Sequence, residues 1–303
     1  MERVVQPELL DELPARDPRA ARSRRDLRRL NMLMGHHRIM ANALGLVSKG
    51  WHASDYGQPP AATPSPRPGG ARTGARGFEL ETNSLLTPAQ RKIIFHRGFA
   101  RSCSREGEEE NQALSGKTRP YGHELFRISE LGAGGGEFLL SVARRLNGRW
   151  QNVEATLVDR ANVFDSQTRG EFGALGWRTN VEVQDALSWL RHSQAGKCDV
   201  LVTNLFLHQC PDQDLAEMFS LAANLAKILI AVEPHRGFWP LLCSRFVGLA
   251  GCGAVTRYDA PVSVRAGFRG CELSTLWPDK KNWDLTERRA GLFSHLFIAR
   301  WKR

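Results

Sequence analysis

From about residue 121 onwards, short apolar runs alternate with segments of helical periodicity. The apolar runs that predict strands lie at residues 125–131, 154–158, 181–183, 200–206 and 228–232. The helical patterns between them cover residues 136–146, 167–175, 186–192 and 212–225. Strands that alternate with helices pair in parallel, so this pattern predicts an α/β fold with a Rossmann-like, doubly wound sheet.

The C-terminal part departs from this alternation. Residues 283–287 and 294–301 are two strand candidates separated by a turn that contains Gly291. A terminal hairpin of this kind would add an antiparallel strand to a sheet that is otherwise parallel. Before it, the run from Ala254 to Phe268 is interpreted as strand-like, and it carries several polar side chains.

The N-terminal residues 1–49 are predicted to form a helical cap. Asp17 and Pro18 can start a helix, and leucines recur at helical spacing up to residue 44. The opposite face is rich in arginine. We interpret it as the solvated face of a helix that packs on the main domain, with a lid over a substrate as an alternative. A nucleic-acid contact is disfavoured because no aromatic residues lie between the arginines.

Residues 50–120 have a different composition. They hold 7 of the 15 prolines and almost no sustained apolar periodicity. Such a stretch buries too little apolar surface to offset the entropy of ordering it, so we predict a disordered or loosely structured insertion. Residues 121–303 then form the main domain.

Composition excludes several classes of protein. With 42% hydrophobic and 24% charged residues, the 303-residue chain is neither wholly disordered nor a disulfide scaffold. The net charge of +10 is uneven: residues 1–120 contribute +7 (20 basic, 13 acidic) and residues 121–303 only +3 (22 basic, 19 acidic). This weakens the alternative of an RNA-binding enzyme.

No segment suggests export or a membrane partner. The first 29 residues are crowded with charge, and the apolar stretch at residues 237–255 is interrupted by Arg245 and several glycines. The six cysteines form no C-x-x-C pair, so we expect reduced thiols in a cytoplasmic protein and no metal site.

The strongest site signal is the glycine-rich loop from Glu130 to Gly136, which follows a strand and opens a helix. Glycines there let the backbone approach a ligand closely. The dinucleotide fingerprint would require a glycine where Glu137 stands, and the carboxylate of Glu130 would repel a pyrophosphate. Asp159 ends the next strand, where an acid can accept both hydroxyls of a ribose.

Together with Asp185 and Asn204, these motifs resemble those of class I S-adenosylmethionine-dependent methyltransferases. The string from Ala254 to Phe268 is similar to that of a bacterial subgroup of small-molecule methyltransferases, whose substrate the resemblance does not supply. An antiparallel final strand is also typical of the family. The resemblance covers about residues 121–303, and the insertion at residues 50–120 is a departure from the subgroup.

The resemblance implies a set of cofactor contacts. The glycines would pack against the methionine moiety, Glu130 would lie near its amino group, and Asp159 would bind the ribose. Asp185 would bind the adenine, although a helix N-cap is an alternative role for it. The predicted cofactor-binding residues are Glu130, Gly132, Ala133, Gly134, Gly136, Asp159, Arg160, Asp185, Ala186 and Asn204.

The acceptor side is less defined. A base is needed if the acceptor is a hydroxyl or an acidic carbon, and His208 or His235 could supply it; a histidine in the core is the alternative for His208. His36 and His37 could also face the pocket. The candidate substrate contacts, each of which could instead be a structural pair, are Arg236, Asp259, Ser263 and Arg265.

The sequence therefore predicts a methyltransferase that uses S-adenosylmethionine to methylate oxygen or carbon of a small, hydrophobic or aromatic acceptor. Apolar neighbours of Asn204 and the lack of prolines after it favour such an acceptor over a base amine. A catalytically inactive S-adenosylmethionine-binding module and a nicotinamide-dependent oxidoreductase are the alternatives. The oligomeric state cannot be read from the sequence.

Overall fold

The computed structural model describes residues 1–47, 125–146, 150, 152–194 and 198–302. All of them belong to one unit, made of residues 1–62 and 119–303. The predicted insertion at residues 50–120 lies outside the described residues.

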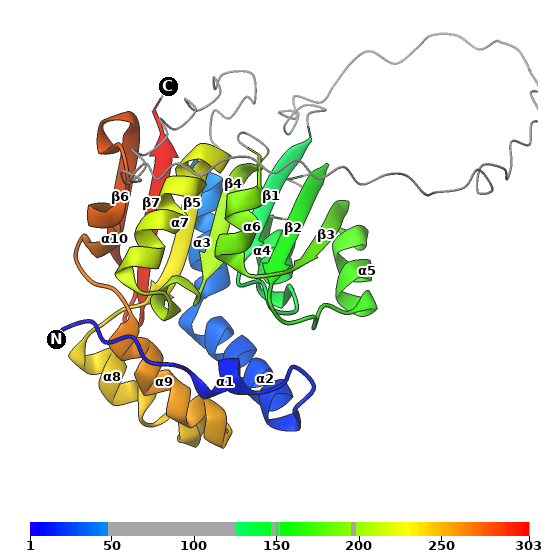
Figure 1. Ribbon diagram of the computed structural model, residues 1–303. Helices are drawn as coiled ribbons and strands as arrows, with labels where there is room; N and C mark the ends of the chain where they lie inside the picture. Colours follow the sequence, from blue (N-terminus) through cyan, green and yellow to red (C-terminus); the bar gives the residue numbers. More distant parts are fainter. Residues whose placement is uncertain (48–124, 147–149, 151, 195–197, 303) are drawn as a thin grey trace, which may run out of the picture. The chain divides into compact units, whose positions relative to one another are not determined.

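A seven-stranded sheet forms the centre of this unit, with the strand order β3-β2-β1-β4-β5-β7-β6 (Figure 1). The first five strands pair in parallel, whereas β7 is antiparallel to both of its neighbours. The strands are β1 (Phe126–Leu131), β2 (Val153–Asp159), β3 (Trp177–Val183), β4 (Cys198–Asn204), β5 (Ala226–Pro234), β6 (Trp283–Ala290) and β7 (Ser294–Trp301). The predicted fold class, including the antiparallel C-terminal strand, is confirmed.

Helices cover both faces of the sheet, and the burial of each strand explains its sequence pattern. The central strands β4 and β5 are buried on both faces and have continuous apolar runs, whereas the edge strands β3 and β6 alternate buried and exposed positions. The helices between the parallel strands are α4 (Glu137–Leu146), α5 (Ser166–Ala174), α6 (Ala186–His192) and α7 (Asp212–Leu225). The α/β layering is therefore the one that the alternation predicted.

The N-terminal helix of the prediction is three helices in the structure: α1 (Leu9–Glu12), α2 (Pro18–Met34) and α3 (His36–Val47). Asp17 caps α2 through the backbone N–H of Arg19, as expected from the Asp-Pro pair. The chain breaks after α2 because Gly35 takes a left-handed conformation (φ +71°). This break turns α3 onto the sheet, where it packs against α4 and β5.

The strand-like interpretation of Ala254–Phe268 is wrong, because residues Ala254–Ala266 form helix α9. Val255, Asp259, Val262 and Ala266 recur at helical spacing and are buried. Because Asp259 is polar although it is buried, the apolar residues alone do not show the helical period in the sequence.

The helix α9 belongs to a group that covers the carboxyl ends of the parallel strands. It contacts α1, α2 and α8 (Phe238–Ser244), and these helices lie together below the sheet in Figure 1. The short elements near them are η2 (Leu207–Gln209), η3 (Val247–Ala250), α10 (Glu272–Leu276) and η4 (Lys280–Asn282). We call α1, α2, α8, η3 and α9 the cap. Within the described residues, no helix combines the length and hydrophobicity needed to cross a bilayer.

Candidate functional site

The predicted site residues converge on one edge of the sheet, between the strands and the cap. In the order β3-β2-β1-β4-β5, successive strands are added in one direction from β1 to β3 and in the other from β4 to β5. Ligands of open α/β sheets bind at such a switch point, beyond the carboxyl ends of the strands. Glu130, Asp159 and Asn204 each lie at or next to the carboxyl end of a strand here. The sheet topology thus brings together residues that the sequence separates by up to 74 positions.

The glycine-rich loop needs its glycines for two different reasons. Gly132, Gly134 and Gly136 all have positive φ, at +71°, +54° and +77°. A Cβ on Gly132 would lie 2.6 Å from the ring of Phe206, so this glycine lets the loop pass the end of β4. At Gly134, by contrast, a Cβ would meet nothing within 4 Å. The loop therefore presents backbone toward open space at Gly134, as a loop that cradles a ligand would.

Glu130 is the most unusual side chain of the loop. Its carboxylate is 1% exposed, and its Oε2 atom has no hydrogen-bond partner among the described residues. Burial, with the charges of Asp159 and Glu137 as further causes, raises the pKa of Glu130 well above its ordinary value. A buried carboxylate is costly without a partner. A cationic ligand group would remove that cost.

Asp159 connects β2 with the glycine-rich loop. Its Oδ2 accepts a hydrogen bond from the N–H of Gly134 at 2.7 Å, and its Oδ1 accepts one from the N–H of Ala161 at 2.7 Å. Because each carboxylate oxygen can accept more than one hydrogen bond, the side chain still has capacity for ligand hydroxyls. The next residue, Arg160, is exposed.

Asp185 has the alternative role that the sequence suggested. It is the N-cap of α6, and its Oδ1 accepts from the N–H of Ser188 at 3.0 Å. Ala186 follows it as a buried residue in the first turn of the helix. Only one carboxylate oxygen is used by the cap, and the side chain is exposed, so a ligand contact is compatible with capping.

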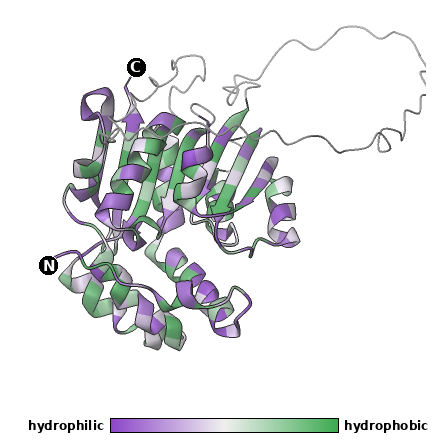
Figure 2. Cartoon of the chain, viewed as in Figure 1, coloured by the Kyte–Doolittle hydropathy of each residue, from purple (hydrophilic) through white to green (hydrophobic). Residues whose placement is uncertain are grey.

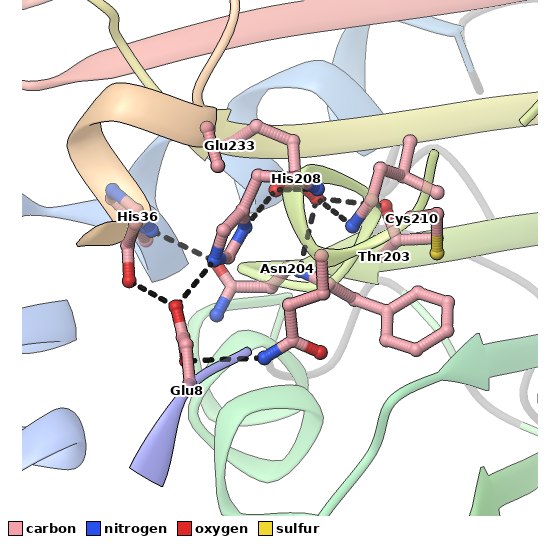
Figure 3. Close-up of polar contacts among 12 residues, drawn as sticks. Glu8, His36, Thr203, Asn204, His208, Cys210 and Glu233 are labelled. Atoms are coloured by element: carbon pink, nitrogen blue, oxygen red, sulfur yellow. Dashed lines mark hydrogen bonds and ion pairs between the residues drawn. The ribbon is translucent and has the colours of Figure 1, made fainter. Parts of the chain in front are cut away.

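Beyond the end of β4, a buried cluster of polar side chains ties this strand to β5 and to the N-terminus (Figure 3). Glu233 of β5 is fully buried and accepts hydrogen bonds from the backbone N–H groups of Phe206, Leu207 and His208 at 3.0–3.3 Å. It also bonds His208 Nδ1 at 2.8 Å. This carboxylate holds the turn after β4 in place.

The other ring nitrogen of His208 meets a residue from the beginning of the chain. His208 Nε2 lies 3.2 Å from Oε1 of Glu8, which is itself buried. Burial alone would lower the pKa of His208, but the hydrogen bonds to Glu233 and Glu8 outweigh burial and raise it to about 10. The imidazole is therefore a cation at neutral pH with both nitrogens occupied. The role of general base that the sequence suggested for His208 does not fit this arrangement.

Asn204 is held by the N-terminal helices. Its Oδ1 lies 2.8 Å from Nδ1 of His36, and its Nδ2 donates to Asn31 at 3.2 Å. Nε2 of His36 in turn bonds the hydroxyl of Ser294 at 2.8 Å. Burial lowers the pKa of His36 to about 4, so its ring is neutral and serves as a connector. The helices α2 and α3 thereby fix the orientation of the Asn204 amide.

The candidate substrate contacts instead fasten residues 1–12, which we call the N-terminal strap. Asp259 accepts from the N–H groups of Leu9 and Leu10, and Ser263 hydrogen-bonds Glu8. Arg236 is buried, donates to the carbonyls of Met1 and Gly267, and forms an ion pair with Glu272. Val4 donates to the carbonyl of Arg265. Each residue thus has structural contacts, but with partners other than those that the sequence suggested: Arg236 pairs with Glu272, and Asp259 and Ser263 bind the strap.

His235 is the remaining candidate base. Its ring stacks on that of His295 with centroids 6.0 Å apart, and its buried Nδ1 has no hydrogen-bond partner among the described residues. Burial and the neighbouring His295 and Arg289 lower its pKa, so the ring is neutral at neutral pH. His295 itself bonds Glu287 at 2.8 Å. His235 therefore keeps a nitrogen that the protein does not use.

The sequence did not indicate a role for Glu8. It grouped Glu233 with His235 and Arg236, whereas the structure pairs Glu233 with His208. For Glu233, an available signal is the Glu-Pro pair at the end of a buried strand. For Glu8 there is none, because its partner lies 200 residues away.

A cavity of about 630 Å³ lies elsewhere, between α3 and the strands β6 and β7. Arg38, Arg288 and Arg300 are among the residues around it, with Leu296 and Ile298 as apolar members. None of its lining residues belongs to the glycine-rich loop or to the polar cluster of Figure 3. It is therefore separate from the site described here.

No protein-family model and no curated protein matches the chain. Solved structures that resemble it include an O-methyltransferase family protein from Burkholderia thailandensis, with 18% identity, 58% of this chain and 51% of that one covered, and a TM-score of 0.40. The S-adenosylmethionine-dependent methyltransferase SibL has 13% identity, coverage of 59% and 51%, and a TM-score of 0.41. The plantazolicin methyltransferase BpumL in complex with SAH has 13% identity, coverage of 58% and 76%, and a TM-score of 0.40.

The matched part of this chain spans about half the length of the first two of these proteins. The fold class rests on the sheet itself. The parallel strands, wound outwards in both directions from β1 and β4, together with the antiparallel β7 and a glycine-rich loop after β1, define a Rossmann-like, doubly wound fold.

Proposed function

We propose that the chain is an S-adenosylmethionine-dependent methyltransferase that methylates oxygen or carbon of a small, apolar acceptor. The observation that carries this proposal is the buried Glu130 carboxylate, whose Oε2 has no partner among the described residues, beside a glycine-rich loop that is open at Gly134. S-adenosylmethionine carries both an ammonium and a sulfonium, so it supplies the missing positive charge. A dinucleotide would instead bring a pyrophosphate to a negatively charged loop end.

Each residue of the site would contact a different part of the cofactor. Glu130 would receive the ammonium group, Gly134 would face the methionine moiety and Asp159 would hold the ribose hydroxyls. Asp185 and Ala186 would flank the adenine. When bound, the cofactor supplies an electrophilic methyl group, so the protein has mainly to align it with the acceptor.

For a hydroxyl acceptor, His235 is the group of this chain that we propose as the base. It is neutral, its Nδ1 makes no hydrogen bond to the described residues, and it follows the carboxyl end of β5. His208 serves a different purpose: as a cation between Glu8 and Glu233 it holds the turn after β4, and with it Asn204. We regard His208 as a positioning residue.

Calorimetric titration with S-adenosylmethionine and, in parallel, NADH tests the cofactor. We expect wild type to bind the former alone, and Asp159→Asn and Glu130→Gln each to weaken binding by about tenfold or more, since each removes a charge-assisted contact. Asp214→Asn, an exposed carboxylate on α7, is the matched control and should bind like wild type. A folded wild type that binds no S-adenosylmethionine would refute the proposal.

Catalysis is tested separately, by measuring S-adenosylhomocysteine formation with phenolic and quinol acceptors. We expect turnover with at least one apolar acceptor and its loss in His235→Gln with cofactor affinity retained. Cofactor binding without turnover across the panel would favour the alternative of an inactive binding module.

A further inference from the structure

Helix α8 exposes its aromatic side chains, which is the reverse of the pattern expected for a helix that packs on a protein core. Its buried residues are Pro240 and Ser244, four positions apart on one face. Trp239 is 61% exposed, and Phe238, whose ring packs edge-on against Trp239 at 5.4 Å, is 70% exposed. Phe246, two residues after the helix ends, is 57% exposed. An amphipathic helix normally buries its large apolar side chains and exposes its polar ones.

The turn that follows extends this exposed surface. The N–H of Leu249 bonds the carbonyl of Phe246 at 2.9 Å, and residues three apart in such a turn lie on the same side. Leu249 is 88% exposed. We call Phe238, Trp239, Phe246 and Leu249 the apolar face. Figure 2 shows hydrophobic residues along α8 and the segment after it, although these elements lie outside the sheet layers.

The surroundings of the apolar face are positively charged. Residues 237–258 contain Arg245 and Arg257 and not one Asp or Glu. Arg257 lies against η3, since a Cβ on Gly248 would be 2.9 Å from its Cδ. From α2, Arg22 reaches the same turn and donates to the carbonyl of Gly251 at 3.4 Å. Arg245, Arg257 and Arg22 therefore lie on or against the segment that carries Phe246 and Leu249.

The carboxylate in this part of the cap does not offset their charge at the surface. Asp26 of α2 is buried, and it accepts hydrogen bonds from the N–H of Gly253 at 2.7 Å and from the hydroxyl of Thr256 at 3.2 Å. A second copy of the chain would bring an equally positive face to this one, so self-association here is opposed by like charges. A partner that fits the face must be both apolar and anionic.

We propose that the apolar face is a peripheral membrane-binding surface for anionic lipids. Trp and Phe side chains favour the boundary between headgroups and acyl chains, and arginines beside them bind lipid phosphates. Such a surface binds without spanning the bilayer. It therefore revises the sequence-based expectation of no membrane partner, and it does not depend on the proposed methyltransferase activity.

Co-sedimentation with vesicles tests this proposal on the full chain. We expect wild type to bind phosphatidylcholine vesicles that contain phosphatidylglycerol, and to bind pure phosphatidylcholine vesicles at least about tenfold more weakly. The triple variant Trp239→Ser, Phe246→Ser, Leu249→Ser should lose binding by about tenfold or more. Arg245→Gln with Arg257→Gln should remove most of the preference for anionic vesicles.

Leu33→Ser is the matched control, because Leu33 is 75% exposed on α2 but is not part of the apolar face. It should bind vesicles like wild type. Circular dichroism and thermal melting of each variant distinguish lost binding from lost folding, and since the substituted side chains are exposed we expect unchanged melting. Three results would overturn the proposal: wild type that binds no vesicles, a folded triple variant that binds as wild type does, or a wild-type dimer in gel filtration that the triple variant converts to a monomer.

Discussion

The two halves of the sheet edge treat their buried carboxylates in opposite ways. On the β1–β2 side, Glu130 is buried with an unpartnered oxygen. On the β4–β5 side, Glu233 is equally buried but accepts three backbone hydrogen bonds and faces the cationic ring of His208. In the function that we propose, the first carboxylate receives a ligand, whereas the second is already neutralised by His208.

The difference separates a carboxylate that stabilises the fold from one that is available for binding, although both lie at the same edge of the sheet. A buried charge with complete partners stabilises the fold and is costly to remove, while one without partners destabilises the free protein and is offset only when a ligand binds. The same substitution of Glu by Gln should therefore have opposite effects on stability in the two halves.

The largest effect is expected from Glu233→Gln. An amide cannot neutralise the His208 cation, and its NH₂ group would face backbone donors, so we expect a loss of about 3–5 kcal/mol in the free energy of unfolding. Urea unfolding at pH 7 measures it. The control is Glu217→Gln, which breaks an exposed ion pair with Arg191 and should cost less than about 1 kcal/mol. Equal losses in the two variants would contradict the comparison.

The next effect is the pH dependence that His208 adds to stability. Its folded pKa of about 10 lies above the ordinary 6.5, so the folded state holds the proton more tightly. The stabilisation is complete below pH 6.5 and is lost as the pH rises toward 10, by up to about 1.4 kcal/mol per pH unit. Unfolding free energies of wild type and His208→Gln between pH 6 and 9 should converge as the pH rises. Parallel curves would show that His208 is not held as a cation.

The smallest effect, and the one of opposite sign, is expected from Glu130→Gln in the ligand-free protein. The raised pKa of Glu130 means that the folded state is penalised once the pH exceeds the ordinary value near 4.5, where the unfolded carboxyl ionises. Removing the charge should stabilise the free protein by about 1 kcal/mol at pH 7, by a margin that shrinks below pH 5. Thermal melting across this pH range measures it. If Glu130→Gln instead destabilised the free protein at pH 7, the carboxylate would already have a cationic partner, and the comparison would be contradicted.

Much of the fold could be predicted because its signals are local. The central parallel strands contain short apolar runs, and the glycine-rich loop combines tight turns and an open face within seven residues. On the β1–β2 side, the contact between Gly134 and Asp159 spans only 25 residues, although Arg28 and Glu137 pair across 109 residues.

The contacts on the β4–β5 side could not be predicted, because they join residues that are far apart in the sequence. Glu8 and His208 are 200 residues apart, and His36 and Ser294 are 258 apart, so no spacing rule connects them. Helix α9 was misread because Asp259 occupies a buried position of its apolar stripe, where it caps α1 instead of packing with valines. Polar contacts of long sequence separation are thus the reason why neither helix α9 nor the buried polar cluster of Figure 3 could be predicted.

The N-terminal strap has a consequence for the order of folding. Its partners at residues 208, 259 and 263 are separated from it by about 200 to 250 residues, and contacts of such long range form late because loop closure must precede them. The strap should dock after the transition state, so substitutions in it would speed unfolding and leave the folding rate almost unchanged. The strap would then be the last of the described elements to reach its native contacts.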